Sequence, residues 1–178
     1  RLLAMTLPPD RLERFARHIV LPEIGGTGQL ALAGAHVALV GLGGIGSPVL
    51  QYLAGAGVGR LTLIDDDRVD ISNLQRQMLF DAHDVGALKA ERAEEWLTRF
   101  DPALTVQAVA MRVDADNAGA LIEGVSLVLD GSDNFATRLA ISDACVASGI
   151  PLVSAAVGRF QGQVAAFAGH LPGQPCYR

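Results

Sequence analysis

Three glycines with the spacing G-x-G-x-x-G, Gly41, Gly43 and Gly46, follow an apolar run. In this pattern one glycine permits a tight turn, one lets backbone N–H groups approach a phosphate, and one lets helix and strand pack closely. A second apolar run ends at Asp65, nineteen residues after Gly46, where a carboxylate can bind ribose hydroxyls. A glycine turn that only permits close packing is the alternative. The order of an apolar run, a glycine-rich turn, a second apolar run and an acid favours a nucleotide-binding site.

A long polar segment, 66–77, follows Asp65. Loops of this length at the carboxyl end of a strand often carry function, and an arginine there can bind a phosphate through two parallel hydrogen bonds. A solvated loop is the alternative. The amide and guanidinium donors of this segment are Asn73, Gln75, Arg76 and Gln77.

Asp133 and Asn134 follow another buried run, 126–130, which ends in a further acid, Asp130. Ligands of open α/β sheets bind outside the carboxyl ends of the strands, so we expect both side chains at the ligand-binding edge. Asp is also favoured at a helix N-cap, so a purely structural role for Asp133 stays open. Lys89 taken alone would be a surface lysine.

The hydrophobic periodicity predicts strands and helices in alternation, which is typical of a Rossmann-like, doubly wound α/β fold with a mainly parallel sheet. The expected strands are 36–40, 61–64, 105–111, 126–130, 152–157 and 163–167. A glycine-rich connection is expected over 21–28, followed by a short helix or turn over 29–34. The other expected helices are a basic-sided helix opening at Pro9, then 46–57, 85–100, 117–124 and 135–148.

Size and composition fit one α/β domain, because 50% of the 178 residues are hydrophobic and only 19% are charged. We expect residues 1–35 to form an N-terminal helical segment packed on this domain, and 36–178 to form the domain itself, incomplete at its C-terminus. The net charge of −5 gives no support to a nucleic-acid or anionic-membrane surface.

Residues 24–59 contain no Asp, Glu, Lys or Arg, but glycines and polar residues interrupt them, so a buried strand and a packed helix explain them better than a membrane span. The apolar start of the chain is too short for a signal peptide, and two cysteines make no disulfide framework. A reducing cytoplasm is therefore the expected location.

Eight segments carry a resemblance to a known family: Arg14-Phe-Ala-Arg-His-Ile, Leu21-Pro-Glu-Ile-Gly-Gly, Gly41-Leu-Gly-Gly-Ile-Gly-Ser, Ala56-Gly-Val-Gly, Asp70-Ile-Ser-Asn-Leu-Gln-Arg-Gln, Val85-Gly-Ala-Leu-Lys, Leu129-Asp-Gly-Ser-Asp-Asn-Phe-Ala-Thr-Arg and Pro175-Cys-Tyr-Arg. With them the chain resembles the adenylating enzymes related to MoeB, ThiF and HesA, which share their fold with ubiquitin-activating enzymes. The resemblance runs from about Leu12 to the last residue, and Ser72-Asn-Leu-Gln-Arg-Gln is its most specific part.

The resemblance implies ATP-dependent adenylation of the C-terminal glycine of a small ubiquitin-like sulfur-carrier protein that ends in Gly-Gly, giving an acyl-adenylate and pyrophosphate. The carrier is of the molybdopterin synthase small-subunit type, and the thiamine-pathway carrier is the alternative. A homodimer and Mg²⁺ are also implied. The chemistry suits these residues, because a carboxylate attacks an anionic phosphate slowly unless groups are positioned and charge is neutralised.

The resemblance also implies residue roles. Arg76, Lys89 and Asp133 would be catalytic, with Asp133 holding Mg²⁺, and Arg17 would reach the phosphates bound by the other subunit. The implied nucleotide-binding residues are Gly41, Gly43, Gly44, Asp65, Ser72, Asn73, Leu74, Gln75, Arg76, Lys89, Asp133 and Asn134.

The chain departs from the family pattern at two places. Gly131 stands where many relatives have Cys after the strand-ending aspartate, and this should leave Asp133 in place. Cys176 resembles the start of a C-x-x-C half-site for zinc, but a four-ligand site cannot be built from it alone, so zinc is expected only in a longer chain. Cys145 is interpreted as a small core residue.

Two other functions fit parts of the sequence. An NAD-dependent oxidoreductase would use the same glycines and Asp65. Its chemistry does not require Arg76, Lys89 and Asp133 to gather at one edge of the sheet, whereas binding a triphosphate with Mg²⁺ does. A non-catalytic binding domain is the other alternative.

Overall fold

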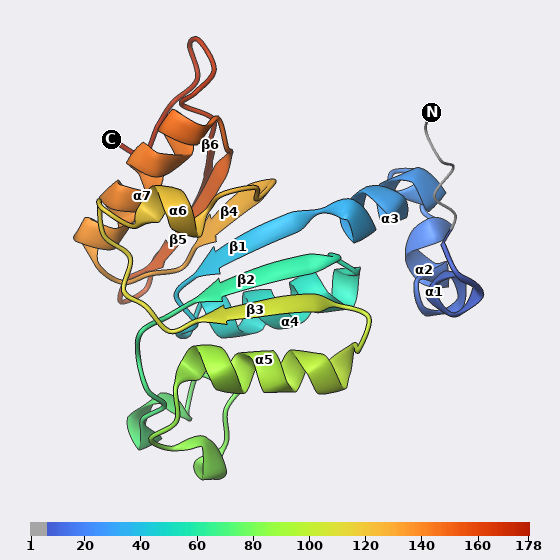
Figure 1. The fold of residues 1–178 in the computed structure, drawn as a ribbon, viewed down its shortest axis with the longest axis horizontal. Helices are drawn as coiled ribbons and strands as arrows, with labels where there is room; N and C mark the ends of the chain where they lie inside the picture. The colour runs from blue at the N-terminus through green and yellow to red at the C-terminus, as the bar shows by residue number, and fades with distance from the viewer. Residues whose placement is uncertain (1–6) are drawn as a thin grey trace.

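Six strands form one sheet in the order β3-β2-β1-β4-β5-β6, in the computed structural model, which describes residues 7–178 (Figure 1). All neighbouring strands are parallel except β5 and β6, which are antiparallel. The predicted Rossmann-like, mainly parallel sheet is confirmed. The strands are β1 (His36–Val40), β2 (Arg60–Ile64), β3 (Thr105–Val109), β4 (Leu127–Asp130), β5 (Leu152–Val157) and β6 (Gly162–Phe167).

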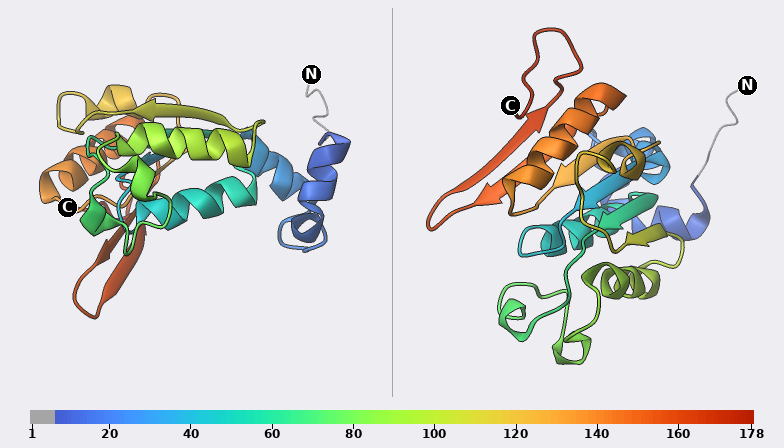
Figure 2. Two further views of the ribbon diagram at one scale, coloured as in Figure 1. Left: turned by 90° about the horizontal axis from the view of Figure 1, so that it is seen from below. Right: turned by 60° about the vertical axis from the view of Figure 1, so that its left-hand side comes forward.

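Helices cover both faces of the sheet (Figures 1 and 2). The helices are α1 (Pro9–Arg14), α2 (Ala16–Ile19), α3 (Gly25–Gly34), α4 (Gly46–Ala56), α5 (Lys89–Phe100), α6 (Ala118–Leu121) and α7 (Phe135–Ser148), and two 3₁₀ turns are η1 (Ile71–Asn73) and η2 (Ala82–Asp84). The antiparallel β5–β6 hairpin packs on α7 at one end, and its turn projects beyond the rest of the molecule (Figure 2).

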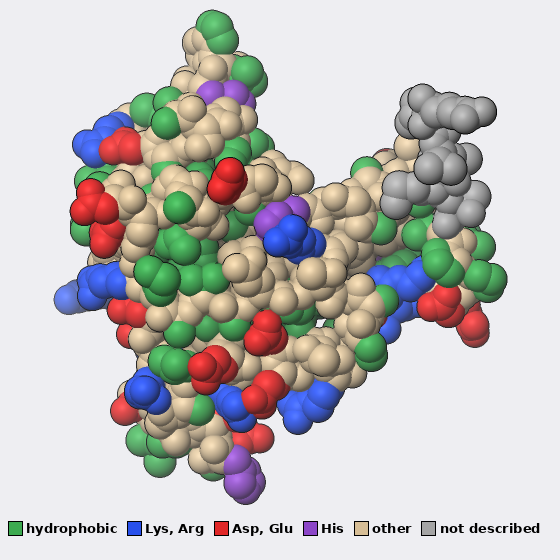
Figure 3. Space-filling view, viewed as in Figure 1, with side chains coloured by type: hydrophobic (Ala, Val, Ile, Leu, Met, Phe, Trp, Pro, Cys, Tyr) green, Lys and Arg blue, Asp and Glu red, His purple; other side chains and the backbone are tan. Residues whose placement is uncertain are grey.

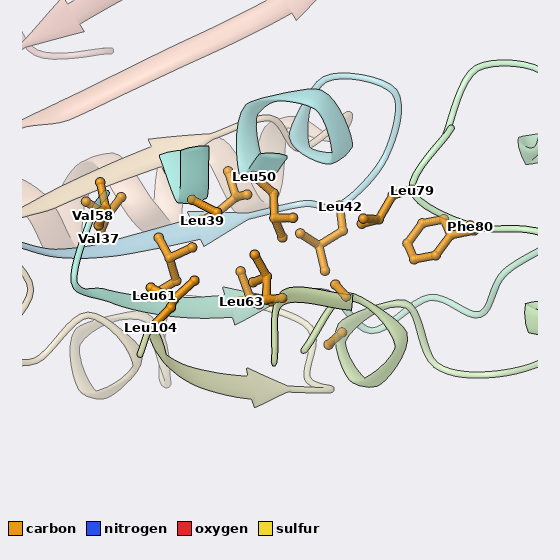
Figure 4. Close-up of a cluster of buried hydrophobic side chains, with 14 of the residues drawn as sticks. Val37, Leu39, Leu42, Leu50, Val58, Leu61, Leu63, Leu79, Phe80 and Leu104 are labelled. Carbon is orange, nitrogen blue, oxygen red and sulfur yellow. The ribbon is translucent and has the colours of Figure 1, made fainter. Parts of the chain in front are cut away.

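Strand β1 separates two hydrophobic cores because its side chains alternate between the two faces of the sheet. Val37 and Leu39 face α4 and α5, together with Leu61 and Leu63 of β2 (Figure 4). Ala38 and Val40 belong to the other core, beneath α6 and α7. With both faces covered, β1 reads as a continuous apolar run, as a central parallel strand should.

Helix α5 begins at Lys89, so the prediction of a helix from Val85 is wrong. Gly86 has φ of +90°, which a continuing helix cannot accommodate, and its N–H donates to the Val69 carbonyl at 2.8 Å. Just upstream, Asp81 and Asp84 cap the turn η2 reciprocally. Residues 85–88 are therefore held against the segment after β2, and Val85 is exposed.

Helix α3 begins at Gly25, inside the segment predicted to be a glycine-rich connection. A tertiary contact outweighs the low helix propensity of glycine here. The Oε1 of the fully buried Gln29 accepts a hydrogen bond from His18 Nδ1 at 3.1 Å, and its Nε2 donates to the Ala56 carbonyl at 2.9 Å. Strand β3 also differs, since it ends at Val109 and not at residue 111.

Helices α1 and α2 lie at the amino ends of the central strands (Figure 1). Arg11 anchors them there, because its guanidinium donates to both oxygens of the buried Asp101, at 2.6 and 2.8 Å. The division of the chain at residues 35 and 36 stays a prediction. The apolar start that we judged too short for a signal peptide lies mostly outside the described residues, which begin at residue 7.

Charged side chains of both signs are mixed on the face seen in Figure 3. None of the helices in the described part of the chain has the length and apolar character needed to cross a bilayer.

Cys145 lies on the buried face of α7, and this position predicts a low reactivity for its thiol. Burial, together with the nearby Asp130 carboxylate, raises the pKa of the Cys145 thiol to about 12. Since the thiolate is the reactive form, its fraction at pH 8 falls to about 10⁻⁴, and alkylation should be roughly a thousandfold slower than in the unfolded chain. The rate should rise with pH.

Mass spectrometry after iodoacetamide treatment measures this rate. A Cys176→Ser variant isolates the Cys145 signal, and denaturation in urea supplies the reference rate. Fast labelling of Cys145 in the folded variant at pH 8 would contradict its assignment to the core.

Candidate functional site

A cleft of about 910 Å³ opens at the carboxyl ends of β1, β2, β4 and β5. Strand order reverses between β1 and β4, since β2 and β3 lie on one side of β1 and β4 to β6 on the other. Open α/β sheets bind ligands at this kind of point, because the connections after the two strands diverge and leave a crevice. The predicted residues that line the cleft are Gly41, Gly43, Gly44, Asp65, Asn73, Arg76, Gln77, Lys89, Asp133 and Asn134.

The glycine loop after β1 is tight enough to require glycine at two positions. Gly41 has φ of +84°, and a Cβ there would lie 2.9 Å from the Ser132 backbone nitrogen. A Cβ on Gly46 would overlap the carbonyl oxygen of Gly41. The loop therefore turns sharply into α4, whose N-terminal end carries the positive end of the helix dipole.

Asp65 fixes this loop to the end of β2. Its carboxylate accepts hydrogen bonds from the backbone nitrogens of Leu42, at 2.6 Å, and Asp67, at 2.8 Å. Burial raises the pKa of the Asp65 carboxyl above its ordinary value, although these two hydrogen bonds and the charge of Lys89 oppose the shift. Each carboxylate oxygen can accept a further hydrogen bond, so the predicted contact with a ribose hydroxyl is compatible with this structural role.

Lys89 is a buried cation at the start of α5 and not a surface lysine. Its side chain is only 5% exposed, and its Nζ donates to Asp67 Oδ2 at 2.8 Å. The backbone nitrogen of Lys89 also donates to the Asp67 carbonyl, at 3.0 Å. An ammonium group has three donors, so the ion pair with Asp67 leaves donors for an anion in the cleft.

The polar loop after β2 is held by the turn η1. Asp70 caps this turn, accepting from the Ser72 nitrogen at 2.8 Å, while the Asn73 side chain accepts from the Asp70 nitrogen. Arg76 is exposed over the cleft, and its Nη1 donates to the Ser72 carbonyl at 3.1 Å. Ser72, Leu74 and Gln75, which we predicted to contact the nucleotide, are not among the residues that line the cleft.

Gln77 is buried beside the glycine loop. The residue is 2% exposed, and within residues 7–178 its Oε1 has no hydrogen-bond partner. A Cβ on Gly43 would lie 3.8 Å from Gln77 Nε2. The amide is therefore a polar group at the cleft wall, with hydrogen-bonding capacity that the described residues leave unused.

Asp133 does not cap the helix α7. The N-cap is Asn134, whose Oδ1 accepts from the Thr137 nitrogen at 2.9 Å. The prediction that Asp133 could be the N-cap is therefore wrong, and its role in the site stays a prediction. The Asp133 carboxylate is exposed at the cleft, and it makes no hydrogen bond with any residue that the structure describes.

Sequence reasoning missed Arg138, a buried arginine under the loop that carries Asp133. It lines the cleft and lies 3.6 Å from Asp130 Oδ2. The available signal was a single basic residue in the helical segment 135–148, which otherwise has no Lys or Arg. Such a residue in a helix packed on the core needs a partner.

The structure does not bring Arg17 or Cys176 into the cleft. Arg17 is exposed on α2, at the opposite ends of the central strands (Figure 1). Cys176 Sγ donates to the Arg178 carbonyl at 3.4 Å. Within residues 7–178, no three His, Cys, Asp or Glu side chains lie close enough together to hold a metal ion. The roles assigned to these two residues stay predictions.

Several characterised proteins resemble this chain along most of its length. A SAMP-activating enzyme E1 of Haloferax volcanii is 43% identical over 176 residues, which make up 99% of this chain and 64% of that protein. A sulfur carrier protein adenylyltransferase of Thermus thermophilus is 45% identical over 95% of this chain and 64% of its own length. A molybdopterin-synthase adenylyltransferase of Salmonella typhimurium is 45% identical over 97% of this chain and 69% of its own. The chain thus spans 64% to 69% of these relatives.

Solved structures show the same fold. Escherichia coli tRNA N6-threonylcarbamoyladenosine dehydratase, TcdA, in complex with ATP, superposes with a TM-score of 0.79 and 32% identity, over 84% of this chain and 61% of that one. Escherichia coli MccB with MccA-N7isoASN gives a TM-score of 0.83 and 25% identity, over 96% of this chain and 52% of that one. Residues 15–178 match the sequence model of the ThiF family, and the chain therefore belongs to the ThiF family.

Proposed function

We propose that this chain is the adenylating part of an enzyme that uses ATP to activate the C-terminal glycine carboxylate of a small ubiquitin-like sulfur-carrier protein ending in Gly-Gly. The proposal rests chiefly on the cleft, where a phosphate-binding type of glycine loop meets the cations Arg76 and Lys89 and the acid Asp133, which has no partner among residues 7–178. The relatives support it, since they include a sulfur carrier protein adenylyltransferase and a molybdopterin-synthase adenylyltransferase.

The chemistry requires two anions to meet. One oxygen of the glycine carboxylate forms a bond to the α-phosphorus, and the bond from that phosphorus to the oxygen bridging the β-phosphate breaks, so that pyrophosphate leaves with the electron pair. Lys89 and Arg76 would neutralise charge on the phosphates, and the backbone N–H groups near Gly43 and Gly44 would orient them. Asp65 would hold the ribose.

Asp133 has the properties of a Mg²⁺ ligand. Protein sites usually hold Mg²⁺ through one or two carboxylates together with substrate phosphates and water. In the part of the chain that the structure describes, the Asp133 carboxylate makes no hydrogen bond, whereas the oxygens of Asp130 accept from Ser132 and Ser154. When bound, Mg²⁺ would stabilise the charge on the leaving pyrophosphate.

Two measurements test this function on the longest available chain. Calorimetry should show tighter binding of ATP with Mg²⁺ than of NAD, and pyrophosphate exchange should depend on the carrier. The molybdopterin-type carrier is the expected substrate, and the thiamine-pathway carrier is the alternative to run beside it. Tighter binding of NAD would favour an oxidoreductase, and ATP binding without exchange on either carrier would favour a binding domain.

Replacing Asp133 by alanine should separate catalysis from binding. Because a metal ligand matters most as charge develops on the leaving group, Asp133→Ala should lower pyrophosphate exchange on the order of a hundredfold or more while weakening ATP binding much less. Asp143→Ala is the matched control, since Asp143 is an exposed acid elsewhere on α7, paired with Arg178. If Asp133→Ala catalysed pyrophosphate exchange at nearly the rate of the unmodified protein, Asp133 would not be a catalytic residue.

A further prediction concerns Arg17, which we propose to act in the cleft of a second subunit of a homodimer. Arg17→Ala and Lys89→Ala should each be nearly inactive. After mixing, each heterodimer has one site with both substitutions and one with neither, because both subunits lend the same surface. Random mixing at equal concentration should restore roughly a quarter of the activity per site.

The control for this experiment is a chain that carries both substitutions, mixed with the unmodified protein. If the site is shared, neither site of that heterodimer is intact, and activity should fall to roughly a quarter instead of a half. Native mass spectrometry reports whether heterodimers form. Heterodimers without recovered activity in the first mixture would show that Arg17 does not act across an interface.

A further inference from the structure

Arg138 joins three elements beneath the cleft. It projects from α7 and is only 6% exposed. Its Nη1 donates to Ser154 Oγ of β5 at 2.9 Å, and its Nη2 donates to the Ala155 carbonyl at 2.8 Å and to the carbonyl of Ser132. One guanidinium therefore connects a helix, a strand and the loop that follows β4.

Asp130 holds the same loop from its other side. Its Oδ1 accepts from the backbone nitrogen of Ser132 at 3.0 Å and from Ser132 Oγ at 2.7 Å, and its Oδ2 accepts from Ser154 Oγ at 2.8 Å. Ser132 is thus bound through its nitrogen, its hydroxyl and its carbonyl. Only the contact to the carbonyl comes from Arg138.

Asp133 is the next residue, and no side-chain contact within the described chain orients its carboxylate. Its direction depends on the backbone, which Ser132 fixes on one side and the cap residue Asn134 on the other. We propose that Arg138 is a positioning residue that acts through Asp133, by fixing the Ser132 carbonyl so that the Asp133 carboxylate faces the cleft. This inference rests on the proposed function, in which Asp133 contributes to adenylation.

The geometry requires arginine at this position. A guanidinium is planar and offers five donors in a fixed fork, so it can bond Ser154, Ala155 and Ser132 together, whereas a lysine ammonium on a flexible stem cannot reproduce that fork. Stability alone is a weak reason for such a group, since a buried ion pair can often be replaced by apolar side chains without loss. A role in shaping the loop accounts for its place at the cleft wall.

The first test measures the loop itself, without nucleotide or carrier. Hydrogen–deuterium exchange by mass spectrometry should show faster exchange in peptides covering 130–136 for Arg138→Lys than for the unmodified protein. Ile141→Val is the matched control, because Ile141 is fully buried on the same helix and makes no part of this network. It should lower the melting temperature without changing the exchange of 130–136.

The second test is a double-mutant cycle on carrier-dependent pyrophosphate exchange. Arg138→Lys and Asp133→Asn should each lower kcat, Arg138→Lys by roughly ten- to hundredfold, the scale of a small misplacement at a reacting centre. If Arg138 acts through Asp133, the double variant should fall within about twofold of Asp133→Asn alone. The KM for the carrier should change little.

Three results would overturn the proposal: unchanged amide exchange over 130–136 in Arg138→Lys, the same local change in Ile141→Val, or effects of the two substitutions that multiply in full. The failure of the proposed function looks different. In that case the unmodified protein shows no carrier-dependent pyrophosphate exchange at all. The hydrogen–deuterium exchange of the backbone amides still reports whether Arg138 holds the loop.

Discussion

The two hydrogen bonds that Asp65 accepts from the backbone nitrogens of Leu42 and Asp67 connect the parts of the cleft. One bond holds the glycine loop against the end of β2, and the other shapes the start of the polar segment. Asp67, placed in this way, pairs with Lys89 and so joins α5 to the same edge. Asp65 is thus the side chain that bonds both the glycine loop and the start of the polar segment that pairs with Lys89.

The acids of the site divide by burial. Asp65 and Asp130 are buried, and their carboxylate oxygens accept hydrogen bonds from loop atoms, so they shape the cleft walls. Asp133 is exposed, without a partner in the described chain, and its carboxylate is available to a ligand. Both kinds follow apolar runs in the sequence, and the sequence alone does not separate them, because burial is set by the neighbouring strand and helix.

The strands and the glycine loop could be predicted because their signals are local. Alternation of apolar runs, the spacing of Gly41 to Gly46 and an acid after the second run all lie within short windows. The start of α5 was misplaced because pairing of residues 85–88 with 68 and 69 overrides a helical pattern. Arg138 was missed for a similar reason, since its partners lie up to seventeen residues away on other elements. Nothing in one chain tests the place of Arg17 in a second subunit.

Strand β1 pairs with β2 and with β4, and the second pairing joins residues about ninety positions apart, as Val37 and Leu127 show. Closing so long a loop is entropically costly, which makes parallel pairings of this kind late events in folding. During synthesis the β1–β2 half, with the glycine loop and Asp65, can form while β4 is still inside the ribosome. The side of the cleft that carries Asp133 can be added only afterwards, so we expect the edge of β1 that pairs with β4 to lack a partner strand until β4 has been made.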